Sequence, residues 1–241
     1  MTQLSSVITH PDSTSTPRRP ERVGRALTYK DFKLPALLWA LSAVPMLGGI
    51  LRLRSLAPGA AVTIENARFA ASPLPILVHV VSVSLYCLLG ALQFSTGIRQ
   101  RWLRWHRQAG KLLAVCGLLV GFTGIWMTMF YPIPTALQGS LLYGVRLAVG
   151  AAMVASIVLG WRRILQRDVA NHEAWMIRAY ALGQGAGTQV LVCLPWMLIS
   201  GESGGPTRDL LMTLAWLINV AVAESIIRRR TRRAEGNRAG P

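Results

Sequence analysis

Residues 74–111, LPILVHVVSVSLYCLLGALQFSTGIRQRWLRWHRQAGK, decide the class of fold. The stretch opens with a mostly apolar run over 74–98 and passes directly into a segment dense in arginine and tryptophan. An α-helix rises 1.5 Å per residue, so about 20 apolar residues cross the hydrocarbon layer of a membrane. Arginine, lysine and tryptophan are the usual residues at the membrane–water interface. This pattern predicts a membrane-spanning helix that ends in an interfacial anchor.

Similar apolar runs recur along the chain, at 34–51, 112–131, 139–161, 176–200 and 209–227. Hydrophobic residues make up 52% of the sequence and charged residues only 15%, whereas a soluble domain carries about 25% charged residues. We therefore expect an all-α, polytopic transmembrane bundle of about six spans over residues 34–227. Residues 1–33 are expected to form a disordered basic cytoplasmic tail, and residues 228–241 a basic C-terminal tail.

The charge distribution predicts how the chain is threaded. When alternate connections are assigned to opposite sides, 21 of the 26 Lys and Arg residues fall on the side that holds both termini. The positive-inside rule makes that side cytoplasmic. The net charge of +16 is then explained by topology, with anionic lipid headgroups at the cytoplasmic face as partners. Nucleic acid is not expected as a partner, because no soluble domain remains to bind it.

One face of the second span is polar. His79, Ser82, Tyr86, Gly90, Gln93 and Gly97 recur at helical intervals, and polar side chains in hydrocarbon are costly, so this face should point into the bundle. Arg146 enters the fourth span from the same side as His79. We expect an outer polar site formed by His79, Tyr86, Gln93 and Arg146, with an interfacial anchor as the alternative reading of the arginine.

Two histidines mark the opposite side of the membrane. His106 lies in WHRQAGK before the third span, and His172 lies in NHEAWMIR before the fifth. Two imidazoles on neighbouring hairpins are what a b-type haem needs, so His106 and His172 are candidate ligands of a haem iron, with no other metal expected. Arg107 and Arg178 beside them could bind the anionic or carbonyl oxygens of haem, quinone or a headgroup. Interfacial anchoring explains the same residues without any cofactor.

The remaining motifs give less indication of function. Cys87, Cys116 and Cys193 fall inside spans without metal-binding spacing and are expected to be inert thiols. Gly117/Gly121 and Gly183/Gly187 have the spacing of close helix contacts. Glu224, near the RRR of 228–230, is expected to pair with that tail. No arrangement of catalytic residues is recognisable, so no catalytic residue is named.

Two stretches together resemble a known family, LVHVVSVSLYCLLGALQFSTGIRQRWLRWHRQAGKLLAV and NHEAWMIRAYAL. The family is the bacterial group of predicted membrane proteins called domain of unknown function 2306. The matching residues are His79, Gly90, Gln93, Phe94, Arg99, Arg101, His106, Arg107, Gly110, His172, Trp175, Met176 and Arg178. The resemblance covers about residues 66–200. It implies an all-helical bundle in the bacterial plasma membrane and no established activity.

Three functional classes remain open. A membrane redox protein would use His106 and His172 as haem ligands and exchange electrons with a quinone or another redox partner. A carrier of small molecules or protons would use the polar face of the second span. A non-catalytic partner or assembly factor would use the basic loops only as anchors.

Overall fold

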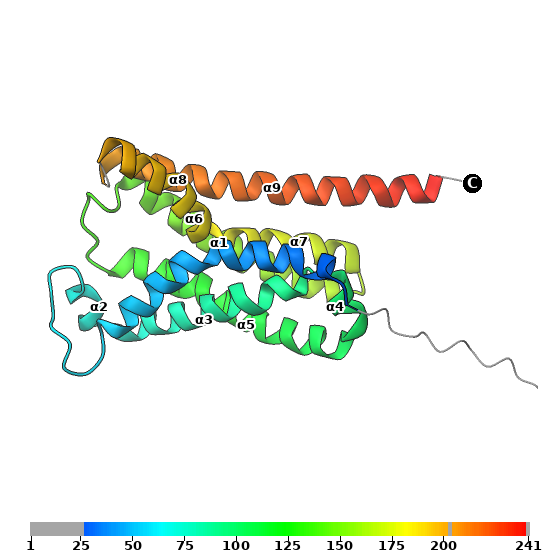
Figure 1. Ribbon diagram of the computed structural model, residues 1–241, viewed down its shortest axis with the longest axis horizontal. Helices are drawn as coiled ribbons and strands as arrows, with labels where there is room; N and C mark the ends of the chain where they lie inside the picture. The colour runs from blue at the N-terminus through cyan, green and yellow to red at the C-terminus, as the bar shows by residue number, and fades with distance from the viewer. Residues whose placement is uncertain (1–26, 202–203, 240–241) are drawn as a thin grey trace, which may run out of the picture.

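The computed structural model describes residues 27–201 and 204–239, and these residues form an all-helical bundle (Figure 1). The helices are α1 (Tyr29–Arg54), α2 (Ala67–Ala71), α3 (Pro73–Gln93), α4 (Thr96–Arg101), α5 (Leu103–Phe130), α6 (Ser140–Leu165), α7 (Val169–Gly183), α8 (Gly185–Ser200) and α9 (Gly205–Ala239). The expected all-α fold is confirmed.

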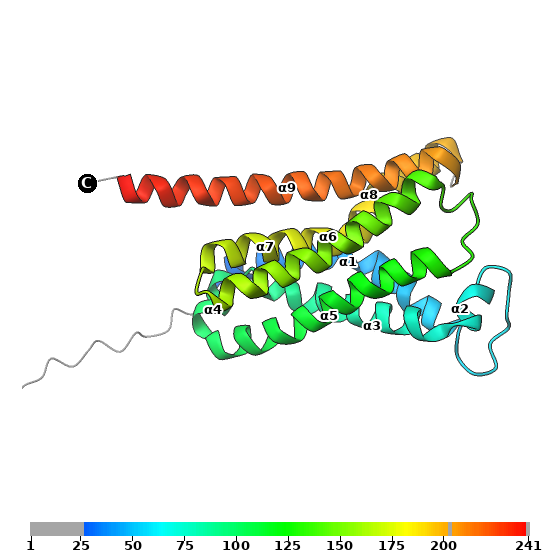
Figure 2. The ribbon, with the colours of Figure 1, turned by 180° about the vertical axis from the view of Figure 1, so that it is seen from behind.

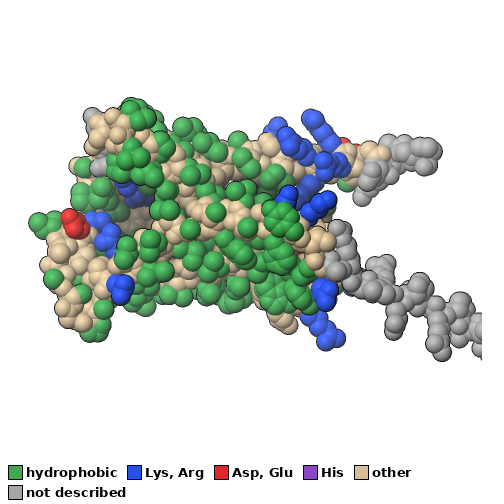
Figure 3. All heavy atoms as spheres, viewed as in Figure 1, with side chains coloured by type: hydrophobic (Ala, Val, Ile, Leu, Met, Phe, Trp, Pro, Cys, Tyr) green, Lys and Arg blue, Asp and Glu red, His purple; other side chains and the backbone are tan. Residues whose placement is uncertain are grey.

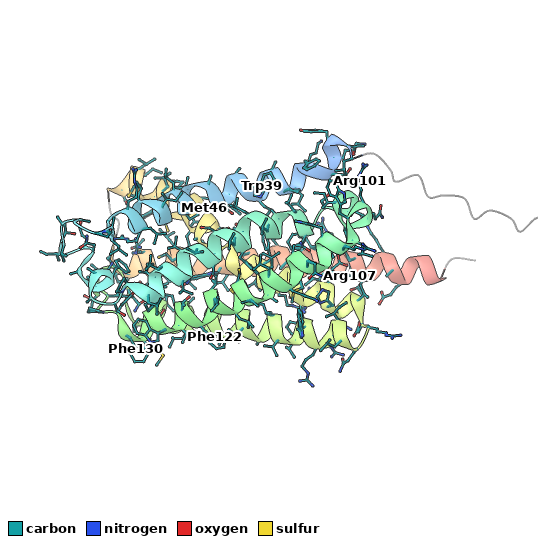
Figure 4. The ribbon with its side chains drawn as sticks, turned by 90° about the horizontal axis from the view of Figure 1, so that it is seen from below. Trp39, Met46, Arg101, Arg107, Phe122 and Phe130 are labelled. Carbon is teal, nitrogen blue, oxygen red and sulfur yellow. The ribbon has the colours of Figure 1, made fainter. Side chains whose placement is uncertain are left out.

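Among the described residues, five helices are long and apolar enough to cross a membrane: α1, α3, α5, α6 and α9. Helices α7 and α8 pass the same test together as one bent span, which gives up to six. Large apolar side chains cover the sides of the bundle (Figure 3), including Phe122 and Phe130 on α5 (Figure 4). A soluble bundle would bury these side chains, so the protein is a multi-pass membrane protein embedded in lipid.

The two ends of the bundle differ in charge. The start of α1, helix α4, the α6–α7 connection and the end of α9 lie at one end, here called the basic end (Figures 1 and 2). Arg101 and Arg107 lie there (Figure 4), and most of the blue side chains of Figure 3 gather there. The opposite end carries α2 and the α5–α6 and α8–α9 connections.

Several helices extend beyond the expected spans. Helix α1 begins at Tyr29, inside the expected tail, because the Asp31 carboxylate accepts hydrogen bonds from the backbone and hydroxyl of Thr28, each at 2.9 Å. Helix α9 continues to Ala239, since arginine near a helix C-terminus is favoured by the helix dipole. The remainder of the expected N-terminal tail lies outside the described residues.

The expected loop around His106 is also largely helical. Helix α3 ends at Gln93, and Ser95 caps the short helix α4 by accepting a hydrogen bond from the Ile98 N–H at 3.3 Å. Helix α5 begins at Leu103, well before the expected residue 112. Gly97 therefore belongs to α4 and does not continue the polar face of α3, contrary to the helical-wheel expectation.

Glycines allow the central helices to approach closely, as expected from their spacing. A Cβ on Gly121 of α5 would lie 2.6 Å from the Val154 side chain of α6, and one on Gly183 would lie 2.9 Å from the Tyr86 ring. Tyr86, Met153 and Ile157 form the middle of the buried core that these approaches close. The packing role of both glycine pairs is confirmed.

The fifth span is broken at Gln184, where α7 and α8 meet at a bend of 41°. A break frees carbonyl groups that hydrocarbon cannot satisfy. Helix α9 supplies the missing donors: Asn219 Nδ2 donates to the Ala181 carbonyl at 3.0 Å, and Trp216 Nε1 to the Leu182 carbonyl at 3.3 Å. Asn219 also accepts a hydrogen bond from the Thr188 hydroxyl at 2.7 Å. The polar residues of α9 therefore hold the break in place.

Candidate functional site

A cavity of about 460 Å³ opens in the half of the bundle that lies away from the basic end. Helices α1, α2, α3, α5, α6, α8 and α9 and the end of α7 all contribute to its walls. Along α3 it extends from Ile76 to Cys87, about 16 Å at the standard helical rise. Its volume falls within the range of small-molecule sites, about 300–1,000 Å³. Figure 3 shows blue side chains beside a hollow at this end of the molecule.

Three arginines from three different helices line this cavity. Arg68 comes from α2, Arg146 from α6 and Arg208 from α9. The described lining residues include no Asp or Glu. Arg146 lies within electrostatic range of Arg68 and Arg208, although these groups repel one another. Convergence of like charges in a concave site favours an anionic ligand.

The carboxylate that acts electrostatically on Arg146 is already engaged. Asp209 of α9 is buried, and its two oxygens accept hydrogen bonds from the N–H groups of Gly139 and Leu142, at 3.2 and 3.1 Å. It thus caps the start of α6, where a negative charge is stabilised by the helix dipole. Asp209 lies within electrostatic range of Arg146, but no recorded ion pair joins the two.

Arg146 and Arg68 contact side chains that carry no negative charge. Arg146 contacts the side-chain oxygen of Gln138, a neutral group. The guanidinium groups of Arg68 and Arg52 each lie 4.6 Å from the centre of the Phe69 ring. Burial, and then the charge of Arg52, lower the pKa of Arg68 from its usual value. A guanidinium remains charged in proteins, so its burial beside a second cation is unfavourable. An anion that binds beside Arg68 would offset this cost.

His79 lines the same cavity and has a defined tautomer. Its Nδ1 lies 2.9 Å from the Thr123 hydroxyl, whose hydrogen is directed to carbonyl groups of its own helix. We therefore assign the hydroxyl as the acceptor and Nδ1 as the nitrogen that carries the hydrogen. Nε2 makes no hydrogen bond among the described residues, so it is available to a ligand.

The deep end of the cavity is polar but internally satisfied. The Ser42 hydroxyl contacts Gln184 Oε1 at 3.0 Å, and Gln184 Nε2 donates to the Tyr180 hydroxyl at 2.8 Å. Tyr180 in turn donates to the Cys87 carbonyl at 2.8 Å. Gln189, which also lines the cavity, donates to the Met212 carbonyl at 3.4 Å. This relay joins α1, α3 and the α7–α8 break and satisfies the polar groups that take part in it.

The structure brings together two of the four residues expected at the outer polar site. His79 and Arg146 line one cavity, each six residues into its helix. Tyr86 is packed in the core against Gly117 and Gly183, and Gln93 lies at the basic end of α3; neither is among the lining residues. Sequence reasoning missed Gln184 and Arg208, because spacing along one helix reveals nothing about residues on α8 and α9.

The inner histidines occupy matching positions at the basic end. His106 and His172 are each the fourth residue of their helices, α5 and α7, and lie within electrostatic range of one another. His172 Nδ1 donates to the Gly160 carbonyl at 2.9 Å, which leaves Nε2 free. His106 Nδ1 is buried without a hydrogen-bond partner. Neither of the two described cavities includes either histidine.

Arg107 and Arg178, the arginines expected beside these histidines, have different surroundings. Arg107 is exposed at the start of α5. Arg178 donates two hydrogen bonds to Glu224 of α9, at 2.6 and 3.0 Å, and stacks on Trp175. Glu224 therefore forms its ion pair with Arg178, because the packing of α7 on α9 brings that residue closer, and Arg228 of the RRR segment acts on it only through its charge. This pair borders a mainly apolar crevice of about 330 Å³ between α6, α7 and α9.

A carboxylate that sequence reasoning overlooked organises the basic end. Glu173, next to His172, pairs with Arg99 of α4 at 3.4 Å and also with Arg230 of α9. In the described part of the chain, no group of three or more His, Cys, Asp or Glu residues is arranged to hold a metal ion. The three cysteines are free thiols; Cys87 and Cys116 are buried, and Cys193 is partly exposed.

These features define a polytopic helical membrane protein with a cation-lined internal cavity. The family model described as "Predicted membrane protein (DUF2306)" matches residues 76–227. The match covers more than half of the chain, so the protein belongs to this family, as the resemblance implied. Comparisons with curated proteins and with solved structures give no match.

Proposed function

We propose that this protein binds a small anionic molecule in the arginine-lined cavity and acts as a membrane carrier or binding protein for it. The observation that carries the proposal is the convergence of Arg68, Arg146 and Arg208 on one cavity whose described lining holds no carboxylate. Charged residues at membrane depth are costly, so a protein keeps them where they serve a ligand or a pathway.

The broken fifth span supports the same function. Discontinuous membrane helices whose ends point into a central site are typical of secondary transporters. Here Gln184 and Gly187, at the α7–α8 break, both line the cavity. The positive-inside rule places the basic end in the cytoplasm, so the cavity faces the other side of the membrane. Anionic headgroups would then contact the arginines of the basic end.

Binding can be measured on the full chain in nanodiscs with paired probes: hexanoate and hexyl phosphate, each compared with hexanol. We expect the anions to bind and the alcohol to bind much more weakly. Arg68→Gln and Arg146→Gln each remove a charge-assisted contact worth about 1.5–3 kcal/mol, which corresponds to a ten- to hundredfold loss of affinity.

Arg54→Gln is the matched control, because Arg54 is exposed at the same end of the bundle and does not line the cavity. Equal weakening by Arg54→Gln would mean that the anions bind only to general surface charge. Absence of binding by every anion would refute the proposal.

A second candidate function is ligation of a b-type haem by His106 and His172, with electron exchange through a quinone or another redox partner. The observation that favours it is the Nδ1 hydrogen bond of His172 to the Gly160 carbonyl. Histidines that bind a metal through Nε2 usually donate Nδ1–H to such a group. A reduced-minus-oxidised absorbance spectrum of protein made with ample haem tests it: a b-type band lost in His172→Ala supports ligation, and no haem absorbance refutes it.

A further inference from the structure

The cavity has a gradient of polarity along its length. Its positive charge lies near the opposite end, where Arg68 and Arg146 make no ion pair with any carboxylate of the described residues. At the deep end, Ser42 and Gln184 already hydrogen-bond within the protein. A small hydrophilic anion would find cationic partners only at the mouth.

The walls between these two levels are mainly apolar. Val83, Val120, Met153 and Leu182 line the stretch that leads to the α7–α8 break. The whole cavity is about 16 Å long along α3, far more than a single carboxylate or phosphate group fills. Apolar walls of this depth favour an apolar extension of the ligand, because they offer no hydrogen bonds to a hydrated one.

We infer that the ligand is a single-chain amphiphile whose carboxylate or phosphate head contacts Arg68 and Arg146 and whose apolar chain follows α3 toward Cys87. This inference rests on the proposed anion-binding function and adds the class and the orientation of the ligand. His79, level with Arg146, offers Nε2 to a hydroxyl or a protonated oxygen near the head.

Photo-crosslinking in nanodiscs tests the orientation. Two dodecanoate probes are used, one with a diazirine at the chain end and one with a diazirine next to the carboxylate, and the crosslinked peptides are identified by mass spectrometry. The chain-end probe should label the segments around Cys87 and Gln184, whereas the head-end probe should label those around Arg68 and Arg146. Excess dodecanoate or dodecyl phosphate should compete, and dodecanol should not. Competition by only one of the two identifies the head group.

Val83→Phe tests whether the chain enters the deep part of the cavity. Val83 lines the cavity about one helical turn beyond His79 on α3, so a larger side chain there narrows the path toward Cys87. This variant should lose at least tenfold of the deep crosslinking of the chain-end probe, while the head-end probe still labels the segments around Arg68 and Arg146. Gly144→Leu is the control, because Gly144 lies on α6 in open space and outside the lining. Thermal unfolding of both variants verifies that they fold.

The outcomes separate the two proposals. Chain-end crosslinks confined to lipid-facing residues, with hexanoate binding intact, would overturn the amphiphile and leave the anion site standing. Loss of hexanoate binding from the wild-type protein as well would overturn both. Deep crosslinks that vanish in Arg146→Gln would support both.

Discussion

Replacing Asn219 by Ala is expected to destabilise the α7–α8 break and the cavity beside it. Asn219 is 9% exposed and makes two hydrogen bonds across to the broken span, to the Ala181 carbonyl and from the Thr188 hydroxyl. Hydrogen bonds between membrane helices contribute about 0.6 kcal/mol on average and up to about 1.7. Removing two of them, with the Ala181 carbonyl left unpaired, should cost about 1–3 kcal/mol.

The loss can be measured as a shift in thermal unfolding. For a chain of this size, 1 kcal/mol corresponds to about 2–4 °C, so we expect the Tm to fall by roughly 2–12 °C. A thiol-reactive dye reports the transition, because Cys87 and Cys116 are buried in the folded bundle. Ser225→Ala is the control on the same helix, since the Ser225 hydroxyl is bonded only to its own helix at Ala221.

A double-mutant cycle with Thr188→Val isolates the direct contact. The coupling free energy between Asn219 and Thr188 should be about 0.6–1.7 kcal/mol. If Asn219→Ala unfolds at the same temperature as Ser225→Ala, or if the cycle gives no coupling, then α9 does not hold the break and the structural account of the fifth span is refuted.

Three further predictions concern packing, charge and threading. Gly187→Ala should unfold or strongly destabilise the protein, because its Cβ would press on a backbone carbonyl of α1, whereas Gly144→Ala meets open space and should leave the Tm unchanged or raise it. Glu224→Gln should lower the Tm by leaving the Arg178 charge unpaired, and the double neutral variant with Arg178→Gln should recover part of the loss; no recovery would argue against the pair. Arg54→Cys, in a chain without its native cysteines, should react in whole cells with a membrane-impermeant maleimide, because the proposed orientation places residue 54 outside the cytoplasm. Labelling only after lysis would show that the orientation is the opposite one.

Hydropathy and spacing were sufficient to predict the helices but not their ends. The runs of apolar residues located every span, because backbone hydrogen bonding forces a chain in lipid to be helical. The segment RWLRWHRQAGK was expected as a loop, yet residues from Leu103 onward are helical. Arginine, lysine and glutamine are good helix formers, so a helix continues past the hydrocarbon layer until a cap stops it.

The site was only partly predictable for a different reason. His79 and Arg146 could be recognised because each is a polar residue inside an apolar run. Arg68 lies in a connection and Arg208 at the start of α9, so their approach depends on how α2 and α9 fold back over the bundle. Gln184 was indistinguishable from a packing residue, since only the structure reveals that the span breaks there.

The polar groups inside this bundle fall into two sets, and the division indicates where function lies. Asn219, Gln184 and the Arg178–Glu224 pair have complete partners and explain the fold. The groups near the cavity mouth do not: among the described residues, Arg146 has only a neutral hydrogen-bond partner, and His79 Nε2 has none. A membrane protein that needed these groups only for stability would have paired them, because an unpaired polar group in hydrocarbon costs several kcal/mol.

Two other unpartnered atoms, His106 Nδ1 and Gln93 Nε2, lie at the basic end beside the second candidate site. Incomplete hydrogen bonding is thus concentrated at the two ends of the bundle and is absent from the described α7–α8 break between them. The two ends therefore need separate tests. Anion binding that depends on Arg146 and is unaffected by His172→Ala would assign the ligand to the cavity alone, whereas haem absorbance that depends on His172 and is unaffected by Arg146→Gln would establish a second, independent site.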